Sequence, residues 1–222
     1  MNEVAKFPEF CSALHREFNP LDNDNPLFIG LSKTGKLHVA NRSGSMTLAT
    51  NANSFCCTSG FVIYATSAHE AHFVPIQSLF LALSPGYVGE KKVEDEVRRM
   101  ERGSRIVTAV SSNMALVLQM PRGNLETVNP RPLVLEVVKK DVDGYWFSTY
   151  PTFRVDQKAY SGQWRKAFLS CRKHRIDFNV LVEHDPDRFF SDLSKFVEQI
   201  DDVDYVNLFL TGVGCVGLYM DF

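Results

Sequence analysis

The chain has 222 residues, of which 45% are hydrophobic and 23% are charged, and its formal net charge is −2. This length allows one or two domains with a sizeable core, and the near-neutral balance excludes a general electrostatic attraction to nucleic acid. The five cysteines form no Cys-x-x-Cys pair, which argues against a disulfide framework and favours a reducing compartment. Neither a secretory leader nor an apolar run of about 20 residues is found, so we expect no secretion and no membrane partner.

Short apolar segments separated by turns dominate the first part of the chain. Residues 27–31 are apolar, residues 32–35 form a turn with Gly35 at the bend, and residues 36–40 alternate, which predicts a hairpin. Pro75 suggests an edge position for the strand over 73–76, because proline cannot donate to a ladder. Further strands are expected at 55–58, 61–66, 105–110 and 114–118. Short strands at this spacing are typical of a sandwich or a propeller blade.

Three stretches of the first half show no strand pattern. Residues 1–26 are poorly patterned, and the polar residues 41–54 are interpreted as a loop. Residues 90–105 carry dense charges of both signs and are interpreted as a short solvated helix or a surface loop.

The pattern becomes helical after residues 113–130. Pro121 and Gly123 end the preceding strand, and Pro132 suits the first turn of a helix over 132–140. Residues 144–157 are aromatic and irregular, and interrupt the helical pattern.

The remainder of the chain predicts short helices with one apolar face. A helix from Lys158 to His174 is expected, and Asp185-Pro-Asp187 is a helix start, because it combines a cap, a proline at the first position and an acid near the positive end of the dipole. A further helix begins over 203–210, and such helices stack as antiparallel pairs. The apolar stripe of the first helix is Tyr160, Trp164, Ala167, Phe168 and Cys171. The residues expected to be buried by the second are Phe189, Leu193, Phe196, Val197 and Ile200.

Four blocks of sequence carry a resemblance to a known family. They are residues 112–126 (SNMALVLQMPRGNLE), residues 130–135, residues 167–179 (AFLSCRKHRIDFN) and residues 201–209 (DDVDYVNLF). These blocks resemble, in the same order, the signature of the largest Elongator subunit, the IKAP family. The upstream strands, including residues 27–40, resemble it more loosely.

The resemblance implies a segregated α+β fold, in which strands of an incomplete WD40-type propeller are followed by an α-helical, TPR-like solenoid. It implies an internal fragment of a non-catalytic scaffold subunit that supports modification of tRNA wobble uridines, in the cytoplasm with the nucleus as a second compartment. The implied partners are the other Elongator subunits, including the subunit with the acetyl-transfer and radical chemistry, and tRNA indirectly through the complex.

Five segments are expected from the resemblance and the pattern together. They are the propeller end over 1–120, the joint and first solenoid helix over 121–143, an insert without family match over 144–157, the solenoid start over 158–211 and a non-matching tail over 212–222. We hypothesise that the insert and the tail are translated intron sequence, because the family-like pattern resumes directly after the insert.

Motifs of known chemistry fail on their spacing, so we expect no catalytic residue, metal or cofactor. His69-Glu-Ala-His72 has one residue too few between its histidines for a zinc motif, and a polar turn is the better interpretation. His15-Arg-Glu17 lacks the second half of the zinc-deaminase pattern. Residues 212–217 read G-x-G-x-x-G, but only five residues follow them. Cys56 and Cys57 are interpreted as packing residues on opposite faces of a strand.

The helix over 158–175 is basic and offers the candidate contact site. One interpretation is a contact with RNA phosphate or an acidic partner, which would make the chain a small RNA-binding or protein-interaction module. The favoured alternative is a solvated helix face, paired with acids such as Asp177 and Glu183 and suited to the helix dipole. The residues assigned to this contact with tRNA or a partner are Arg165, Lys166, Arg172, Lys173 and Arg175.

Overall fold

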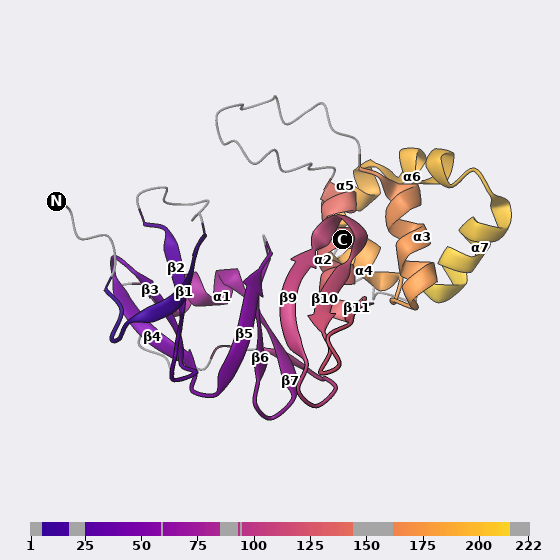
Figure 1. The fold of residues 1–222 in the computed structure, drawn as a ribbon. Helices are drawn as coiled ribbons and strands as arrows, with labels where there is room; N and C mark the ends of the chain where they lie inside the picture. Colours follow the sequence, from indigo (N-terminus) through magenta and orange to yellow (C-terminus); the bar gives the residue numbers. More distant parts are fainter. Residues whose placement is uncertain are drawn as a thin grey trace. The chain divides into compact units, whose positions relative to one another are not determined.

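The computed structural model describes residues 6–17, 25–58, 60–84, 93, 95–143 and 162–213 (Figure 1). The chain divides into two compact units, Met1–Pro130 and Arg131–Phe222, which we call the sheet unit and the helical unit. Antiparallel sheets followed by helices confirm the segregated α+β class. The insert over 144–157 and the tail from residue 214 lie outside the described residues, so their interpretation stays a prediction.

The described strands of the sheet unit form three antiparallel sheets, in which each strand pairs with the next one along the chain. This meander order is the order of strands in a propeller blade. The first sheet contains β1 (Cys11–Glu17), β2 (Leu27–Ser32), β3 (Leu37–Asn41) and β4 (Gly44–Ala49). The second contains β5 (Ala52–Cys57), β6 (Phe61–Thr66), β7 (Glu70–Pro75) and β8 (Glu96–Arg99). The third contains β9 (Arg105–Val110), β10 (Ala115–Gln119) and β11 (Leu125–Val128), with a 3₁₀ turn η1 (Ser111–Asn113) between β9 and β10.

The predicted hairpin over residues 27–40 is confirmed as β2 and β3, and Gly35 has the positive φ of 84° that its bend requires. Neighbouring sheets are joined by side chains as well as by the chain itself. The Ile106 amide of β9 donates to the Ser54 hydroxyl oxygen of β5 at 2.9 Å. This hydrogen bond links the second sheet to the third, although β5 and β9 are not paired with each other as strands.

Three expectations for the sheet unit are wrong. The stretch over 1–26 contains β1, and the stretch over 41–54 contains β4 and the start of β5. Met46, Leu48 and Ala49 of β4 pack against the core, so three apolar side chains suffice to hold an otherwise polar edge strand. The charged block over 90–105 contains β8, whose four residues are all exposed. Charged side chains are common on edge strands because they discourage further pairing, and this explains why the block looked like a loop.

The edge position inferred from Pro75 is also wrong for its strand. β7 lies between β6 and β8, so it is an inner strand of the second sheet. Proline is tolerated because Pro75 is the last residue of β7, while pairing with β8 ends at Phe73.

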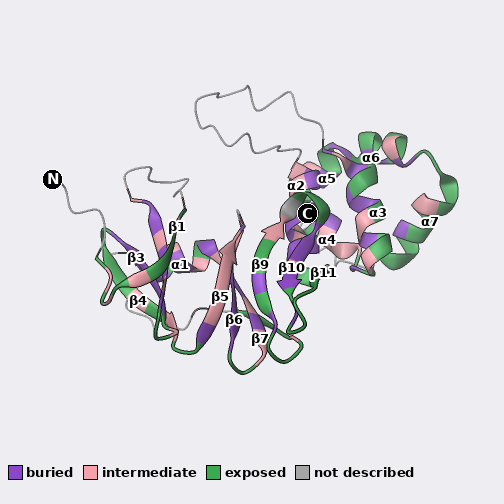
Figure 2. Ribbon diagram, viewed as in Figure 1, coloured by how far each residue is buried: buried purple, intermediate pink, exposed green. Residues whose placement is uncertain are grey.

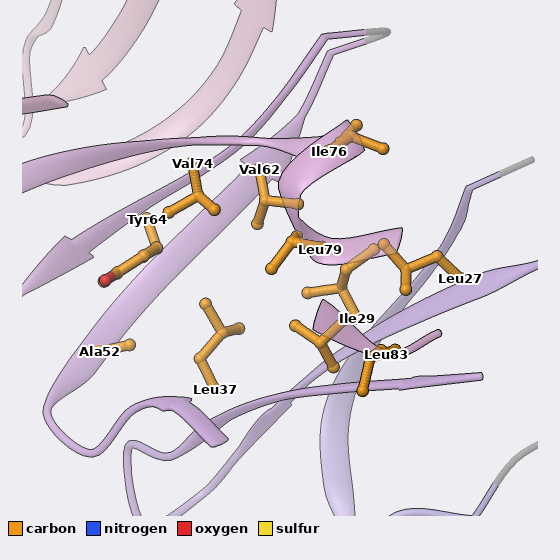
Figure 3. Packing of buried hydrophobic residues seen from close by; sticks show 11 residues of the cluster. Leu27, Ile29, Leu37, Ala52, Val62, Tyr64, Val74, Ile76, Leu79 and Leu83 are labelled. Atoms are coloured by element: carbon orange, nitrogen blue, oxygen red, sulfur yellow. The ribbon is translucent and has the colours of Figure 1, made fainter. Parts of the chain in front are cut away.

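The core of the first two sheets is aliphatic and is covered by helix α1 (Ile76–Ala82) (Figure 3). β3 is buried along its whole length and β6 along all but its first residue (Figure 2). Strands in this position are covered on both faces, which explains the nearly continuous apolar sequence of β6. The members of the cluster between these sheets and α1 that have no exposed surface are Leu27, Ile29, Leu37, Val39, Val62 and Leu79.

The helical unit contains short helices packed around an aromatic core. The helices are α2 (Arg131–Asp143), α3 (Trp164–His174), α4 (Asn179–Glu183), α5 (Pro186–Ser191), α6 (Leu193–Ile200) and α7 (Val203–Gly212). Four residues of the predicted stripe are buried, namely Trp164, Ala167, Phe168 and Cys171, whereas Tyr160 lies outside the described residues. The rings of Trp164, Phe189, Phe196 and Phe209 pack edge-on or tilted at 4.7 to 6.0 Å between centroids.

The helix start at Asp185 is confirmed, because its side chain accepts the Arg188 amide at 3.0 Å and Pro186 opens α5. The single helix expected after it is wrong. α5 ends at Ser191, Asp192 caps it, and α6 begins with Leu193. The break changes which side chains face inward, so Leu193 and Val197 are exposed at 43% and 47% instead of buried.

The change from strands to helices lies close to the predicted joint. β11 pairs with β10 and belongs to the sheet unit, and α2 begins at Arg131. As an account of domain boundaries in the family, the division into five segments stays a prediction.

Candidate functional site

The five basic residues of the candidate contact lie on α3 or directly after it, and all five are exposed. Arg175 ends the helix with a left-handed φ of 54°. The Ile176 amide then donates to the Cys171 carbonyl oxygen at 2.9 Å, which satisfies part of the helix end. The cationic side chains of Arg172, Lys173 and Arg175 near this terminus also interact favourably with the negative end of the helix dipole.

Arg165 and Lys166 are already engaged within the helical unit. The Arg165 Nη1 atom donates to the carbonyl oxygen of Ile200 at 2.7 Å and to that of Gln199 at 3.2 Å. It thereby satisfies carbonyl groups at the end of α6 that have no partner inside that helix. The Lys166 Nζ atom donates to Asp141 Oδ1 of α2 at 2.7 Å. Both cations therefore join α3 to its neighbours.

Arg172 lies over a ring, and the last two cations extend from the surface. The Arg172 guanidinium carbon lies 4.7 Å from the centre of the Tyr205 ring, a cation–π arrangement between α3 and α7. Among the described residues, Lys173 and Arg175 make no side-chain hydrogen bond or ion pair. Burial and then the charge of Lys173 lower the pKa of His174, so this histidine adds no positive charge near neutral pH.

The acids expected to pair with the basic helix are not its partners in the described structure. Asp177 instead accepts the Asn179 amide at 2.9 Å and shapes the turn into α4. The carboxylate that pairs with α3 is Asp141, which lies 25 residues before Lys166. Sequence reasoning missed Asp141 because nothing in the local pattern brings α2 beside α3.

A cleft of about 460 Å³ runs along the exposed side of α3. It is lined by Lys166 and Lys173 together with Ser170 and Gln199, and Arg165 borders it. Because two of these three cations already have partners, the charge that the cleft can offer to an anion is smaller than the sequence indicates. Contact of the five residues with tRNA or a partner stays a prediction.

Replacing Lys166 by methionine is expected to lower the stability of the helical unit by about 1 kcal/mol near neutral pH, after allowance for solvent screening. Asp141 is only 7% exposed, and its Oδ2 atom has no hydrogen-bond partner among the described residues. Burial raises the pKa of Asp141, while Lys166 opposes that rise. An acid with a raised pKa in the fold costs stability above its ordinary pKa, so the deficit should shrink as the pH falls towards about 4.

Urea unfolding of the Lys166→Met variant at several pH values measures this effect. Lys173→Met is the matched control, because Lys173 lies on the same helix without an ion pair among the described residues. A deficit that grows on acidification would contradict the role given to Asp141.

Two other sequence motifs, His69-Glu-Ala-His72 and the glycine-rich stretch that begins at Gly212, have a structural explanation in the fold. His72 lies on β7 and not in a turn, which corrects the interpretation of 69–72; His69 alone occupies the turn, with φ of 66°. The His72 ring stacks on Tyr64 with centroids 4.7 Å apart, and its Nδ1 atom lies 2.5 Å from Asp95 Oδ2. Gly212 ends α7, where a Cβ atom would lie 2.6 Å from the Phe178 ring, so its role is close packing.

Three cysteines are held as neutral thiols by burial. Burial raises the pKa of Cys56 and of Cys171 to about 12, and it raises the pKa of Cys57 further. Thiolates are the reactive form, so these side chains pack as small apolar groups. The described residues contain no group of three or more potential metal ligands, and none of their helices is long and apolar enough to cross a membrane.

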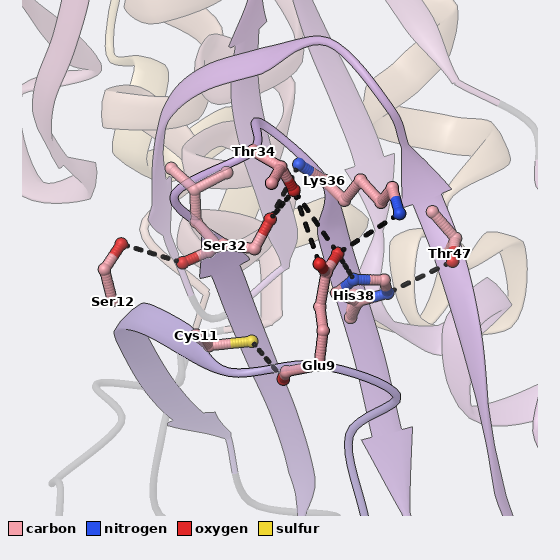
Figure 4. A network of polar contacts seen from close by, with 9 residues as sticks. Glu9, Cys11, Ser12, Ser32, Thr34, Lys36, His38 and Thr47 are labelled. Carbon is pink, nitrogen blue, oxygen red and sulfur yellow. Dashed lines mark hydrogen bonds and ion pairs between the residues drawn. The ribbon is translucent and has the colours of Figure 1, made fainter.

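A polar network holds the segment before β1 against the first sheet (Figure 4). The ring of His38 is 2% exposed, and its Nε2 atom lies 2.8 Å from Glu9 Oε1. Its Nδ1 atom lies 3.1 Å from the Thr47 hydroxyl oxygen, which can donate when Nε2 donates to the carboxylate. Lys36 adds a cation 3.6 Å from the same carboxylate oxygen. Residues 29 positions apart are thus joined by one buried ring.

The Glu9→Gln variant is expected to remove part of the acid sensitivity of the sheet unit. The hydrogen bond from His38 lowers the pKa of Glu9 below its ordinary value of 4.5. Such a carboxylate stabilises the fold above its ordinary pKa, and this contribution is lost as the pH falls through the lowered value. The stability difference between the original chain and the variant should therefore shrink from about pH 6 to about pH 3, whereas Glu101→Gln, at an exposed turn, should show no such trend.

Two family profiles match the chain. The profile described as the ELP1 N-terminal second beta-propeller matches residues 1–107, and the profile described as the ELP1 alpha-solenoid matches residues 153–215. The two matches fall on the sheet unit and the helical unit respectively.

Curated relatives align along most of the chain. Elongator complex protein 1 of Schizosaccharomyces pombe is 35% identical over 97% of this chain, and that of Saccharomyces cerevisiae is 33% identical over 94%. Elongator complex protein 1 of Mus musculus is 36% identical over 74% of it. The chain spans 16%, 15% and 11% of the length of these three relatives, respectively.

Proposed function

Because this chain belongs to the family of Elongator complex protein 1, we propose that it acts as a non-catalytic scaffold segment of the Elongator complex. The observation that carries the proposal is the alignment with the S. pombe relative over 97% of the chain, which includes both the sheets and the helices. In this role the segment supports modification of tRNA wobble uridines in the cytoplasm by holding other Elongator subunits, among them the subunit that performs the chemistry.

The surface of the helical unit supports a role in assembly. Several large apolar side chains on α5, α6 and α7 are exposed. Large apolar side chains that remain exposed on these helices favour contact with further protein. They are Phe190 at 52%, Leu193 at 43%, Val197 at 47%, Val203 at 76%, Leu208 at 40% and Leu210 at 64%.

Affinity purification of the tagged chain tests the scaffold role, with other Elongator subunits identified by mass spectrometry. We expect these subunits to be recovered with the chain, and recovery to fall when Leu193 and Val197 are both replaced by aspartate. Ser194→Asp is the control, because it adds an acid at an exposed polar position of α6. Recovery of the folded chain without any Elongator subunit, or turnover of a substrate by the chain alone, would contradict the proposal.

The alternative of a small module that contacts tRNA through α3 rests on Lys173 and Arg175, whose side chains are exposed. Its test is salt-dependent tRNA binding that is lost in an Arg172→Glu, Lys173→Glu double variant. Unchanged tRNA affinity in that variant would exclude α3 as the contact.

A further inference from the structure

One end of the three sheets forms a continuous edge of turns, which we call the turn edge: residues 33–36, 50–51, 67–69, 100–104 and 120–123. Backbone hydrogen bonds join the first of these turns. The Ala52 amide donates to the Gly35 carbonyl oxygen at 2.8 Å, and the Ser67 amide donates to the Asn51 carbonyl oxygen at 2.9 Å. The hairpin turn of the first sheet is thereby connected to that of the second.

The same edge continues onto the third sheet. The Met100 amide donates to the His69 carbonyl oxygen at 2.8 Å. Gly103 lies so close to the next turn that a Cβ atom on it would be 3.2 Å from the Pro121 side chain. Figure 1 shows the turn between β6 and β7 and the connection into β9 at this same end of the strands. The turns therefore form a row across all three sheets.

Cations outnumber acids along the turn edge. Six exposed cationic side chains lie in the turns or at the strand ends beside them, and three carboxylates, those of Glu9, Glu70 and Glu101, lie near them, so the local net charge is +3. The carboxylate of Glu9 already forms ion pairs with Lys36 and His38. Among the described residues, the four arginines make no ion pair. The six cations are Lys33, Lys36, Arg99, Arg102, Arg105 and Arg122.

We propose that the turn edge binds the phosphate backbone of RNA. A guanidinium group offers planar donors that match phosphate oxygens in pairs, and four of the six cations are arginines. A row of cations suits a chain of phosphates, whose contact needs no apolar pocket. Protein interfaces rely on aromatic or aliphatic anchors, and among the large exposed apolar side chains only Leu125, at the strand end after the last turn, adjoins the described turns. This contact goes beyond the scaffold role and does not depend on it.

The turn edge differs from α3 in the availability of its charge. On α3, Arg165 and Lys166 already bind carbonyl and carboxylate oxygens inside the helical unit. At the turn edge, Arg102 and Arg122 project from two adjoining turns and are exposed. These two arginines can neutralise phosphates without breaking a contact in the described structure.

Fluorescence anisotropy of the whole chain with a labelled oligouridine of about 20 nucleotides tests the proposal at several salt concentrations between about 50 and 200 mM. Two contacts to single-stranded RNA contribute a slope of about −1.4 to the plot of log K against log salt. The Arg102→Glu, Arg122→Glu variant should lose about that slope and bind at least about tenfold more weakly at the lowest salt. The Arg102→Lys, Arg122→Lys variant should keep most of both.

The Arg172→Glu, Lys173→Glu variant is the matched control, because it makes the same charge change in the helical unit, and it should retain affinity and slope. Circular dichroism checks that all variants are folded. The proposal is overturned if the original chain does not bind the oligouridine, if charge reversal at the turn edge leaves binding unchanged, or if reversal on α3 weakens binding equally. Tighter binding of a labelled polyglutamate peptide than of the oligouridine would also overturn it, in favour of an acidic protein.

Discussion

The Phe196→Ala variant is expected to lower the free energy of unfolding of the helical unit by about 3–5 kcal/mol. Phe196 is 1% exposed, and its ring lies 4.7 Å from that of Phe209 and 5.5 Å from that of Phe189. Removing it deletes a buried ring and leaves a cavity between α5, α6 and α7 that rigid neighbouring rings fill poorly. A loss of this size is comparable to the whole stability of a small unit.

Hydrogen–deuterium exchange measures this loss separately in each unit, because it reports on named segments. We expect faster exchange throughout α3, α6 and α7 in the variant. Phe190→Ala is the matched control: its ring contacts that of Phe189 but is 52% exposed, so we expect a loss below about 1 kcal/mol. Equal effects of the two substitutions would show that the aromatic core does not hold the helical unit together.

The Leu79→Ala variant is expected to cost the sheet unit about 2–5 kcal/mol. Leu79 has no exposed surface and lies in the aliphatic core that α1 covers. Truncation removes apolar contacts to the sheets at a place where the strands cannot move inward without losing their pairing. The short helix α1 has no side-chain cap, so its attachment depends on these contacts.

Leu81→Ala is the matched control for this variant, because it makes the same change two residues along α1 at a side chain that is 63% exposed. We expect its effect to stay within about 0.5 kcal/mol, since leucine and alanine have similar helix propensities. Urea unfolding followed by exchange of the β2, β3 and β6 amides distinguishes the two. A stability loss in Leu81→Ala that matches that of Leu79→Ala would contradict the packing role of α1.

Local patterns predicted the elements whose formation depends on neighbours along the chain. The bend at Gly35, the cap at Asp185 and the buried stripe of α3 are confirmed, because each involves residues within a few positions of one another. The helix start near Arg131 also follows from local pattern, since proline suits the first turn of a helix at Pro132, whereas strand β11 after Pro121 was not predicted.

Elements held by contacts with distant residues were misread. β8 has no apolar alternation and exists because it pairs with β7 across the loop before it. β1 and β4 likewise are edge strands of the first sheet, and their pairing with β2 and β3 outweighs a weak intrinsic preference. The exposure of Leu193 and Val197 follows from a break at Asp192 that the apolar spacing alone did not reveal.

The amino-acid sequence alone determined the family resemblance, the order of sheets before helices and the presence of a cationic helix in this protein. Only the tertiary structure decided which of those cations have partners, because Asp141 and the end of α6 reach α3 through packing and not through sequence spacing. It likewise brought Arg102 and Arg122 onto adjoining turns by pairing β9 with β10. Charge is a property of residues, but the availability of a charge for a partner depends on what else the fold places within hydrogen-bonding distance.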